Sequence, residues 1–253
     1  MTAVQPGQRR APAEILVPGI VTVLGLAVLV SLGVWQLQRK AWKEGVIVNL
    51  SERLAAQPVP LASRAAWPQL ERNDMEFRRV SFRAEFLHDQ EALVYAFASA
   101  FRSDVAGPGY WIFTPARLMG GGIVVVNRGF VPEGRRDSAT RREGQITGVI
   151  TIVGALRWPE ERGRFTPADN PQQNLWFVRD HIAMARAKGW DPVAPFYLEQ
   201  ESPSPPGGLP KPGTLHANLV NNHLQYALTW FGLAICLLLV FLIWARQRLP
   251  SPP

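Results

Sequence analysis

The chain contains almost no cysteine: Cys236 is the only one among 253 residues. A lone thiol cannot close an internal disulfide and cannot supply a CxxC metal or redox site. The sequence also lacks HExxH, GxSxG and Walker-type motifs, and no two histidines have the helical spacing of a metal-binding pair. These absences exclude copper–thiolate chemistry and disulfide exchange, and they argue against an enzyme. A hydrolase built from Ser138, Asp180 and His181 can be imagined, but such common residues occur in almost any chain.

Uninterrupted basic runs are also scarce, although the net charge is +7 and the sequence pI is about 10.2. The densest basic stretch holds Arg135, Arg136, Arg141 and Arg142. Glu133, Asp137 and Glu143 interrupt this stretch, and no aromatic residue lies within it. We therefore expect a solvated hairpin loop and no nucleic-acid partner. Contact with anionic lipid headgroups or with an acidic partner is the alternative.

Two long apolar segments, 15–35 and 226–244, contain no Asp, Glu, Lys or Arg. At about 1.5 Å per residue, each is long enough to cross about 30 Å of hydrocarbon as an α-helix. A cleaved signal peptide fits the first segment poorly, because no small-x-small cleavage site follows Trp35. The sequence therefore predicts two membrane-spanning helices, with both ends of the chain on the same side.

The basic residues of the two tails predict the orientation of these helices. They are Arg9, Arg10, Arg246 and Arg248. The positive-inside rule places both tails in the cytoplasm, although Arg39, Lys40 and Lys43 beyond the first helix weaken this bias. The expected regions are a cytoplasmic tail (1–14), a transmembrane helix (15–37), an extracytoplasmic, periplasmic domain (38–217), a transmembrane helix with a polar outer end (218–244) and a cytoplasmic tail (245–253). The first tail is too short for an organelle transit peptide, so the expected location is a bacterial cytoplasmic (inner) membrane.

The chain that leaves the first segment keeps a helical pattern. Its large side chains recur at steps of three and four: Trp35, Arg39, Trp42, Val46, Leu50 and Leu54. This spacing places them on one face of a continuing helix, which we expect to form a stalk. Trp35 and Trp42 suit the bilayer interface, and Arg39 could stack on either ring. A docking face for a partner helix is the alternative interpretation.

From residue 77 onward, short alternating runs separated by turn residues predict antiparallel strands. The candidates are 79–87, 92–98, 110–118, 122–131, 145–156 and 175–178. The glycines at 120–122 predict a hairpin, a single helix is expected at 179–188, and the proline-rich segment 202–213 is expected to be a semi-rigid tether. The predicted fold class is thus a membrane protein of the α+β type, with two transmembrane helices flanking a β-rich extracytoplasmic domain that has one short helix.

A cluster of polar residues directly precedes the second apolar segment: Asn218, Asn221, Asn222, His223 and Gln225. His223, Tyr226 and Trp230 share one helix face because they lie at positions i, i+3 and i+7. An imidazole at the edge of the hydrocarbon could serve as the axial ligand of a metal porphyrin. The simpler interpretation is an ordinary interfacial helix start, in which the asparagines cap free N–H groups and the histidine bonds to headgroups.

Several strings in the sequence resemble the signature blocks of a known family. They are GVWQLQR at 33–39, VNRGFVP at 126–132, NPQQNLWF at 170–177 with Arg179 and Asp180, and NNHLQYALTWF at 221–231. Their order and spacing resemble those of the Surfeit locus protein family, and weaker similarity at 109–115 and 207–210 extends the match over about residues 30–244. The chain departs from the family pattern at Phe130, where tryptophan is common, and at Ala84, where glycine is frequent.

The resemblance implies a non-enzymatic assembly factor for cytochrome c oxidase. Its implied partners are the oxidase core subunit, haem a synthase and membrane lipid, and its implied cofactor is transiently bound haem a. In this interpretation His223 is the axial ligand of the haem iron, Tyr226 and Trp230 wall the porphyrin, and Arg39 meets a propionate if the two membrane helices pack side by side. We expect Gly232 and Cys236 to supply a small-residue surface for that packing.

The other family-like residues are expected to hold the fold or to contact a partner. They are Trp35, Gln36, Asn127, Arg128, Gly129, Asn174, Trp176, Asp180, Asn221 and Asn222. Arg128 either binds a partner carboxylate or satisfies carbonyls of its own domain, and burial is the simpler interpretation for Trp176. Three functions stay open: a haem-holding chaperone, a scaffold for nascent oxidase subunits in which His223 is only structural, and an anchored extracytoplasmic enzyme.

Overall fold

A computed structural model describes residues 13–98, 102, 104–217 and 220–248. The chain divides into two compact units, one made of residues 1–46 and 220–253 and the other of residues 47–219. Asn218 and most of both predicted tails lie outside the described residues.

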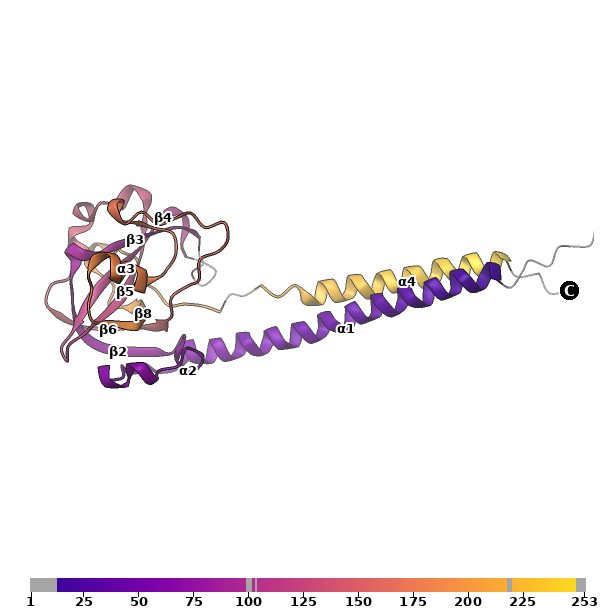
Figure 1. Cartoon of the computed structure of the whole chain (residues 1–253), viewed down its shortest axis with the longest axis horizontal. Coiled ribbons are helices and arrows are strands. Elements are labelled where there is room, and N and C mark those ends of the chain that lie inside the picture. The colour runs from indigo at the N-terminus through magenta and orange to yellow at the C-terminus, as the bar shows by residue number, and fades with distance from the viewer. Residues whose placement is uncertain (1–12, 99–101, 103, 218–219, 249–253) are drawn as a thin grey trace, which may run out of the picture. The chain divides into compact units, whose positions relative to one another are not determined.

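The first unit is formed by α4 (His223–Arg248) and by α1 (Ala13–Ala55) as far as residue 46, and these helices lie side by side in Figure 1. Both are long and apolar enough to cross a membrane. Helix α1 runs without a break to Ala55, so the helical face predicted beyond Trp35 lies on the same helix as the apolar segment. The predicted fold class is confirmed. In the sequence, the two helices stand before and after a β-rich unit, and this unit contains the short helix expected near residue 180.

Glycines of α1 provide the space in which α4 packs. The Phe231 ring fills the position that a Cβ on Gly33 would take, and Leu237 lies 2.9 Å from the corresponding position on Gly25. Gly232 was expected to face α1, and this prediction is wrong: a Cβ added there would meet no atom within 4 Å. The physical reason is the rotation of α4. The buried Ala227 and Ala234 share the α1 side with Phe231, and this leaves Gly232 and the exposed Cys236 outside the contact.

The second unit is a barrel. The strands of the described chain are β1 (Val59–Pro60), β2 (Arg79–Phe86), β3 (Ala92–Ala98), β4 (Ala106–Leu118), β5 (Ile123–Pro132), β6 (Val149–Arg157), β7 (Leu175–Trp176) and β8 (Val193–Ser202). They form one sheet in the order β1-β2-β6-β8-β5-β4-β3-β7, and an additional β2–β4 pairing closes β2, β6, β8, β5 and β4 into a ring. Closure removes the free edges from the central strands.

Two apolar layers hold this unit together. One set of side chains, including Val124, Val126 and Phe196, comes from all the barrel strands and fills the barrel. The neighbouring Val125 belongs to a second cluster, which lies between the outer face of the sheet and α3 (His181–Lys188). This alternation is the period-two pattern of strands. A shorter helix, α2 (Arg72–Met75), precedes β2.

Strand β8 was not predicted, although it is central. The five consecutive residues 196–200 are all buried, so this part of the strand lacks the alternation of exposed and buried positions, and Pro195 interrupts the pattern further. It runs parallel to β5 and antiparallel to β6, and Leu198 pairs with Val126 on one side and Leu156 on the other. The predicted hairpin at 120–122 is present: Leu118 N donates to Gly122 O over 3.0 Å.

The proline-rich segment 202–213 packs against the barrel. Backbone bonds join Lys211 and Phe130 in both directions. The backbone of Lys211 lies where a Cβ on Gly129 would be, and the backbone of Leu209 takes the same place at Gly144. Apart from the 3-10 turn Pro206–Gly208, the segment is irregular, but its path is fixed by these contacts.

Candidate functional site

The polar end of the helical unit brings Gln36 of α1 to His223, the first residue of α4. The distance between His223 Nδ1 and Gln36 Oε1 is 2.7 Å, and the pair is partly buried. An amide oxygen only accepts hydrogen bonds, so Nδ1 carries the proton in this contact. Nε2 is then the nitrogen with the free lone pair. It has no hydrogen-bond partner in the described part of the chain.

The helix packing explains why these two residues meet. Gly33 lies one turn before Gln36, and Phe231 lies two turns after His223, so the close approach at Gly33 draws the polar ends of both helices together. A second polar contact lies nearby: Lys43 Nζ of α1 donates over 2.5 Å to the backbone O of Val220, three residues before α4 begins. The two helices therefore have a defined register at this end.

Both asparagines that precede His223 serve the start of α4. Asn221 Oδ1 accepts from His223 N at 3.4 Å, and Asn222 O accepts from Tyr226 N at 3.3 Å. These bonds satisfy N–H groups that the first helical turn leaves free, as expected for an ordinary helix start. The capping interpretation of the asparagines and a ligand role for the histidine are compatible, because the Asn221 cap bonds to the backbone N–H of His223 and to neither ring nitrogen.

The two aromatic residues predicted to surround His223 lie further along α4. Tyr226 is 56% exposed, and Trp230 is half-buried. The Arg39 guanidinium lies 3.7 Å from the centre of the Trp42 ring, which is one of the two stacking partners expected for it. Trp35 is exposed on α1. One end of the helical unit therefore holds His223 bonded to Gln36, the exposed Tyr226, and Arg39 stacked on Trp42.

In the barrel unit, Asn127 and Gly129 are held in a buried backbone corner. Asn127 Nδ2 donates to Glu199 Oε2 over 2.7 Å, and Asn127 Oδ1 accepts from Gly129 N at 3.1 Å. Gly129 has a φ of +118°, and the Lys211 backbone passes directly over it. Only glycine combines this φ with such a close approach. These residues hold the strand β5 to β8 and to the proline-rich segment.

Arg128 is buried, with 1% of its surface exposed. It donates to Gly144 O and to His88 Nδ1, which lies 3.2 Å away, and its guanidinium sits 4.8 Å above the Phe86 ring. Burial lowers its pKa to about 10. Arg128 therefore satisfies a carbonyl of its own domain, which was one of the two predicted roles, and it does not reach a partner from this position.

Asn174, Trp176 and Asp180 lie around the short strand β7 and helix α3. Asn174 has a positive φ of 53° and donates through Nδ2 to Glu91 O over 2.9 Å. Trp176 is buried, and Asp180 Oδ1 caps α3 by accepting from Ile182 N and Ala183 N at 3.0 Å each. The helix therefore begins at residue 181 rather than at 179.

One member of the basic stretch was assigned wrongly. Arg141 was expected in a solvated loop, but it is buried and forms an ion pair with Glu91. The acidic partner lies 50 positions earlier in the chain, too far for any local pattern to indicate it. The other arginines of the stretch, Arg135, Arg136 and Arg142, are exposed as expected.

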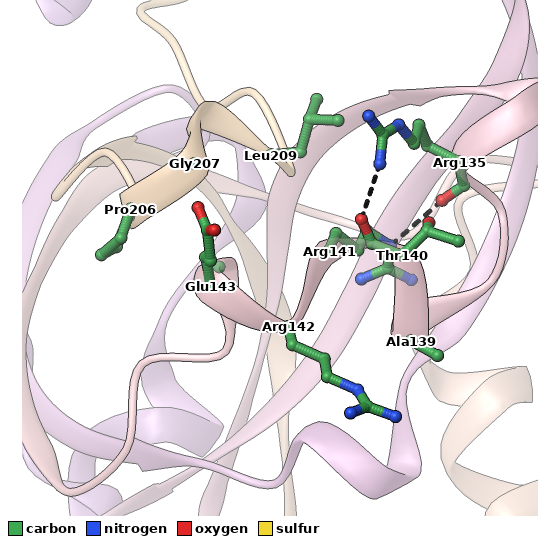
Figure 2. A pocket seen from close by; sticks show the side chains of 10 residues that line it. Arg135, Ala139, Thr140, Arg141, Arg142, Glu143, Pro206, Gly207 and Leu209 are labelled. Atoms are coloured by element: carbon green, nitrogen blue, oxygen red, sulfur yellow. Dashed lines mark hydrogen bonds between the residues drawn. The ribbon is translucent and has the colours of Figure 1, made fainter.

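A cavity of about 300 Å³ opens between the 3-10 segment Ser138–Gly144 and the proline-rich segment (Figure 2). Two of its three arginines donate to nearby backbone carbonyls: Arg135 donates to Thr140 O over 2.8 Å, and Arg141 Nε donates to Arg135 O over 3.3 Å. Glu143 points toward Gly207. Across the described residues, no group of three or more His, Cys, Asp or Glu side chains could hold a metal ion.

Comparison with known proteins identifies the chain's relatives. The family model described as the SURF1 family matches residues 23–235. Surfeit locus protein 1 of Rattus norvegicus is 33% identical over 232 residues, which cover 88% of this chain and 72% of that protein. The human protein of the same name is 34% identical over 233 residues, covering 88% of this chain and 74% of its own length.

The similarity extends beyond vertebrates. The SURF1-like protein of Monosiga brevicollis is 32% identical over 225 residues, which cover 85% of this chain and 83% of that protein. The region matched by the family model, residues 23–235, begins within α1 and ends within α4. It therefore includes the whole barrel unit and both Gln36 and His223. The family-like strings, the fold and the extent of these matches together show that the chain belongs to the SURF1 family.

Proposed function

We propose that the chain is a non-catalytic assembly factor for cytochrome c oxidase. In this role it holds haem a for a short time while the core subunit of the oxidase matures. Family membership supports the general assignment. The observation that carries the haem contact is the His223 ring at the end of the helical unit, with Nδ1 bonded to Gln36 and Nε2 free among the described residues.

The donor set fits a haem. A neutral imidazole with a free Nε2 is the nitrogen ligand that haem iron takes in many proteins. The apolar faces of α1 and α4 supply surroundings for a macrocycle, with Tyr226 and Trp230 on the histidine's own helix. Bound haem a would supply a redox-active iron destined for the oxidase. This chain's residues would hold the iron and shield the ring from water.

A scaffold function is the second candidate, and one observation favours it. Tyr226 is more than half exposed, and the Arg39 guanidinium lies on Trp42, so neither side chain closes a pocket around His223. Exposed aromatic and amide groups on a membrane helix also suit contact with another protein. In that case His223 would serve only to join α4 to α1, and the oxidase core subunit would bind without haem.

The proposed location is a bacterial cytoplasmic membrane, with both tails in the cytoplasm and the barrel unit in the periplasm. The curated relatives described above are eukaryotic, so the family itself does not decide the membrane. Reporters fused to each tail and inserted in the barrel unit test the orientation. Finding all three on the same side of the membrane would contradict the topology. Haem a synthase and the oxidase core subunit are the proposed partners.

Absorption spectroscopy separates the two candidates. The detergent-purified protein, coexpressed with the enzymes of haem a synthesis, should show a Soret band that His223→Ala removes. The matched control is His216→Ala, which changes an exposed histidine and should leave the band unchanged. A colourless wild-type protein that still copurifies with the oxidase would favour the scaffold.

A further inference from the structure

We infer that Gln36 is a positioning residue for His223: its side-chain oxygen holds the imidazole in the tautomer that presents an unprotonated Nε2 to haem iron. The inference rests on the proposed function, because it concerns the same haem contact. Gln36 itself touches no haem in this proposal. It acts only through the hydrogen bond to Nδ1.

The contact is long-range and specific. Gln36 and His223 are 187 positions apart, lie on different helices and approach to 2.7 Å. A free neutral imidazole exchanges between two tautomers, and a fixed acceptor at one nitrogen selects the tautomer that carries its proton there. Because Gln36 Oε1 faces Nδ1, the selected form has its lone pair on Nε2. No second hydrogen bond to this ring competes within the part of the chain that the structure describes.

The place of Gln36 in α1 also needs an explanation. It follows directly after the apolar segment 15–35, where an amide without a partner is costly. Bonding to His223 removes part of this cost, but any polar partner could do so. Orientation of a metal ligand explains in addition why the partner presents an oxygen acceptor, and not a donor, to Nδ1. Such acceptors fix the ring plane of a ligating histidine and raise its basicity.

The test compares three variants of the full-length protein in detergent. Gln36→Leu has nearly the same shape and accepts no hydrogen bond. Gln36→Glu keeps an oxygen acceptor. Lys43→Met is the matched control, since it removes another polar contact of α1 near this end, the bond to Val220 O just before α4, and leaves Gln36 and His223 unchanged.

The first measurement is made without haem. Nitrogen-15 NMR of histidine-labelled protein at about pH 8, where imidazoles are neutral, reports which ring nitrogen carries the proton. The chain has only four histidines, and His223→Ala assigns the relevant signal. Wild type, Gln36→Glu and Lys43→Met should show protonated Nδ1 and unprotonated Nε2. Gln36→Leu should show the averaged signals of exchanging tautomers.

The second measurement is a titration of the same variants with haem a, followed by absorbance. Gln36→Leu should bind haem a about 10- to 100-fold more weakly than wild type, as for the loss of a partner that orients a metal ligand. Gln36→Glu and Lys43→Met should bind as wild type does.

Each failure has its own signature. If His223→Ala abolishes binding while Gln36→Leu binds normally, the role of Gln36 is wrong and the haem contact stands. If His223→Ala binds haem a as wild type does, the haem contact is wrong, and the inference falls with it. If Lys43→Met weakens binding as much as Gln36→Leu, the effect is one of helix packing, and the positioning role is refuted.

Discussion

Asn127 and Glu199 lie opposite each other on the parallel strands β5 and β8, joined by a buried hydrogen bond of 2.7 Å from Asn127 Nδ2 to Glu199 Oε2. The second carboxylate oxygen accepts from Arg179 at 3.2 Å. Both side chains are almost completely inaccessible to water. A buried carboxylate is therefore held by an amide and a guanidinium, and its stability depends on both.

Replacing Asn127 by leucine should destabilise the barrel unit. The buried Glu199 side chain would lose the hydrogen bond from Asn127 and keep only that from Arg179 among the described residues, at a cost of about 3 kcal/mol. In a domain of this size such a loss lowers Tm by about 6–12 °C. Thermal unfolding of the full-length protein in detergent measures it. The exposed Met119→Ala is the control, and equal Tm values for the two variants would contradict the argument.

Gly129→Ala should be strongly destabilising, while Gly134→Ala should be nearly neutral. At Gly129 the φ is +118° and a Cβ would overlap the Lys211 backbone. At Gly134 a Cβ would meet no atom within 4 Å. We expect a cost of about 3 kcal/mol or more at Gly129. The unfolding temperatures of both variants check this. An unchanged Tm for Gly129→Ala would show that the proline-rich segment does not pack closely against β5.

His181 should make the protein less stable in mild acid. Its ring is fully buried, Nε2 bonds to Ala194 O over 3.0 Å, and burial lowers its pKa to about 4. Unfolded histidine binds its proton at about pH 6.5, so between these values the unfolded chain takes up more protons than the folded one. This contribution to stability is complete above about pH 6.5 and is lost as the pH falls toward 4, by about 3 kcal/mol in all.

Denaturant unfolding at several pH values measures this slope. His181→Phe should be less stable at neutral pH, but it should show a flatter dependence between about pH 6.5 and 4. His88, whose pKa burial also lowers, adds to the slope in the same direction and remains in the variant. A variant slope as steep as that of wild type would show that His181 does not control the acid response.

Glu91 and Arg141 form a buried ion pair, so losing one member should cost more than losing both. Arg141→Met leaves an unpaired carboxylate inside the protein, with an expected cost of about 3–5 kcal/mol. Adding Glu91→Leu should recover part of this loss. Unfolding of the single and double variants gives the coupling. The exposed pair Lys40 and Glu44 is the comparison, and Lys40→Ala should change stability by less than about 1 kcal/mol.

Gly33→Leu should separate the two membrane-type helices at their polar end. The Phe231 ring occupies the space that the new side chain needs, whereas the space at Gly232 is open. We expect Gly33→Leu to break the contact between Gln36 and His223, and Gly232→Leu to preserve it. The histidine tautomer observed by NMR reports the outcome. Retention of protonated Nδ1 in Gly33→Leu would contradict the proposed packing.

Elements with strong local signals were predictable from the sequence. The apolar segments define α1 and α4, and the three glycines between alternating runs define the β4–β5 hairpin. Strand β8 escaped prediction because burial on both faces removes the polar alternation that marks a strand. The same limit applies to Arg141, whose environment is set by Glu91, a residue far away in sequence.

The candidate site was predictable only in part. The position of His223 at the start of an apolar helix indicated a special imidazole, and Gln36 lay in a family-like string. Their hydrogen bond depends on the register of two helices separated by a whole barrel unit, and the glycines that set this register read in sequence as ordinary small residues. The small-residue surface on α4 was assigned to the wrong side for the same reason.

The position of β8 between β5 and β6 has a consequence for synthesis on the ribosome. Strands β5 and β6 follow each other in the chain, yet each has one side that pairs with β8, and these pairings cannot form until residues 193–202 have emerged. Until then β5 and β6 each expose an edge with unpaired backbone N–H and C=O groups, and such edges can pair with strands of other chains. The barrel is completed only shortly before α4 is made. The rate of translation between β6 and β8 should therefore affect the yield of correctly folded protein.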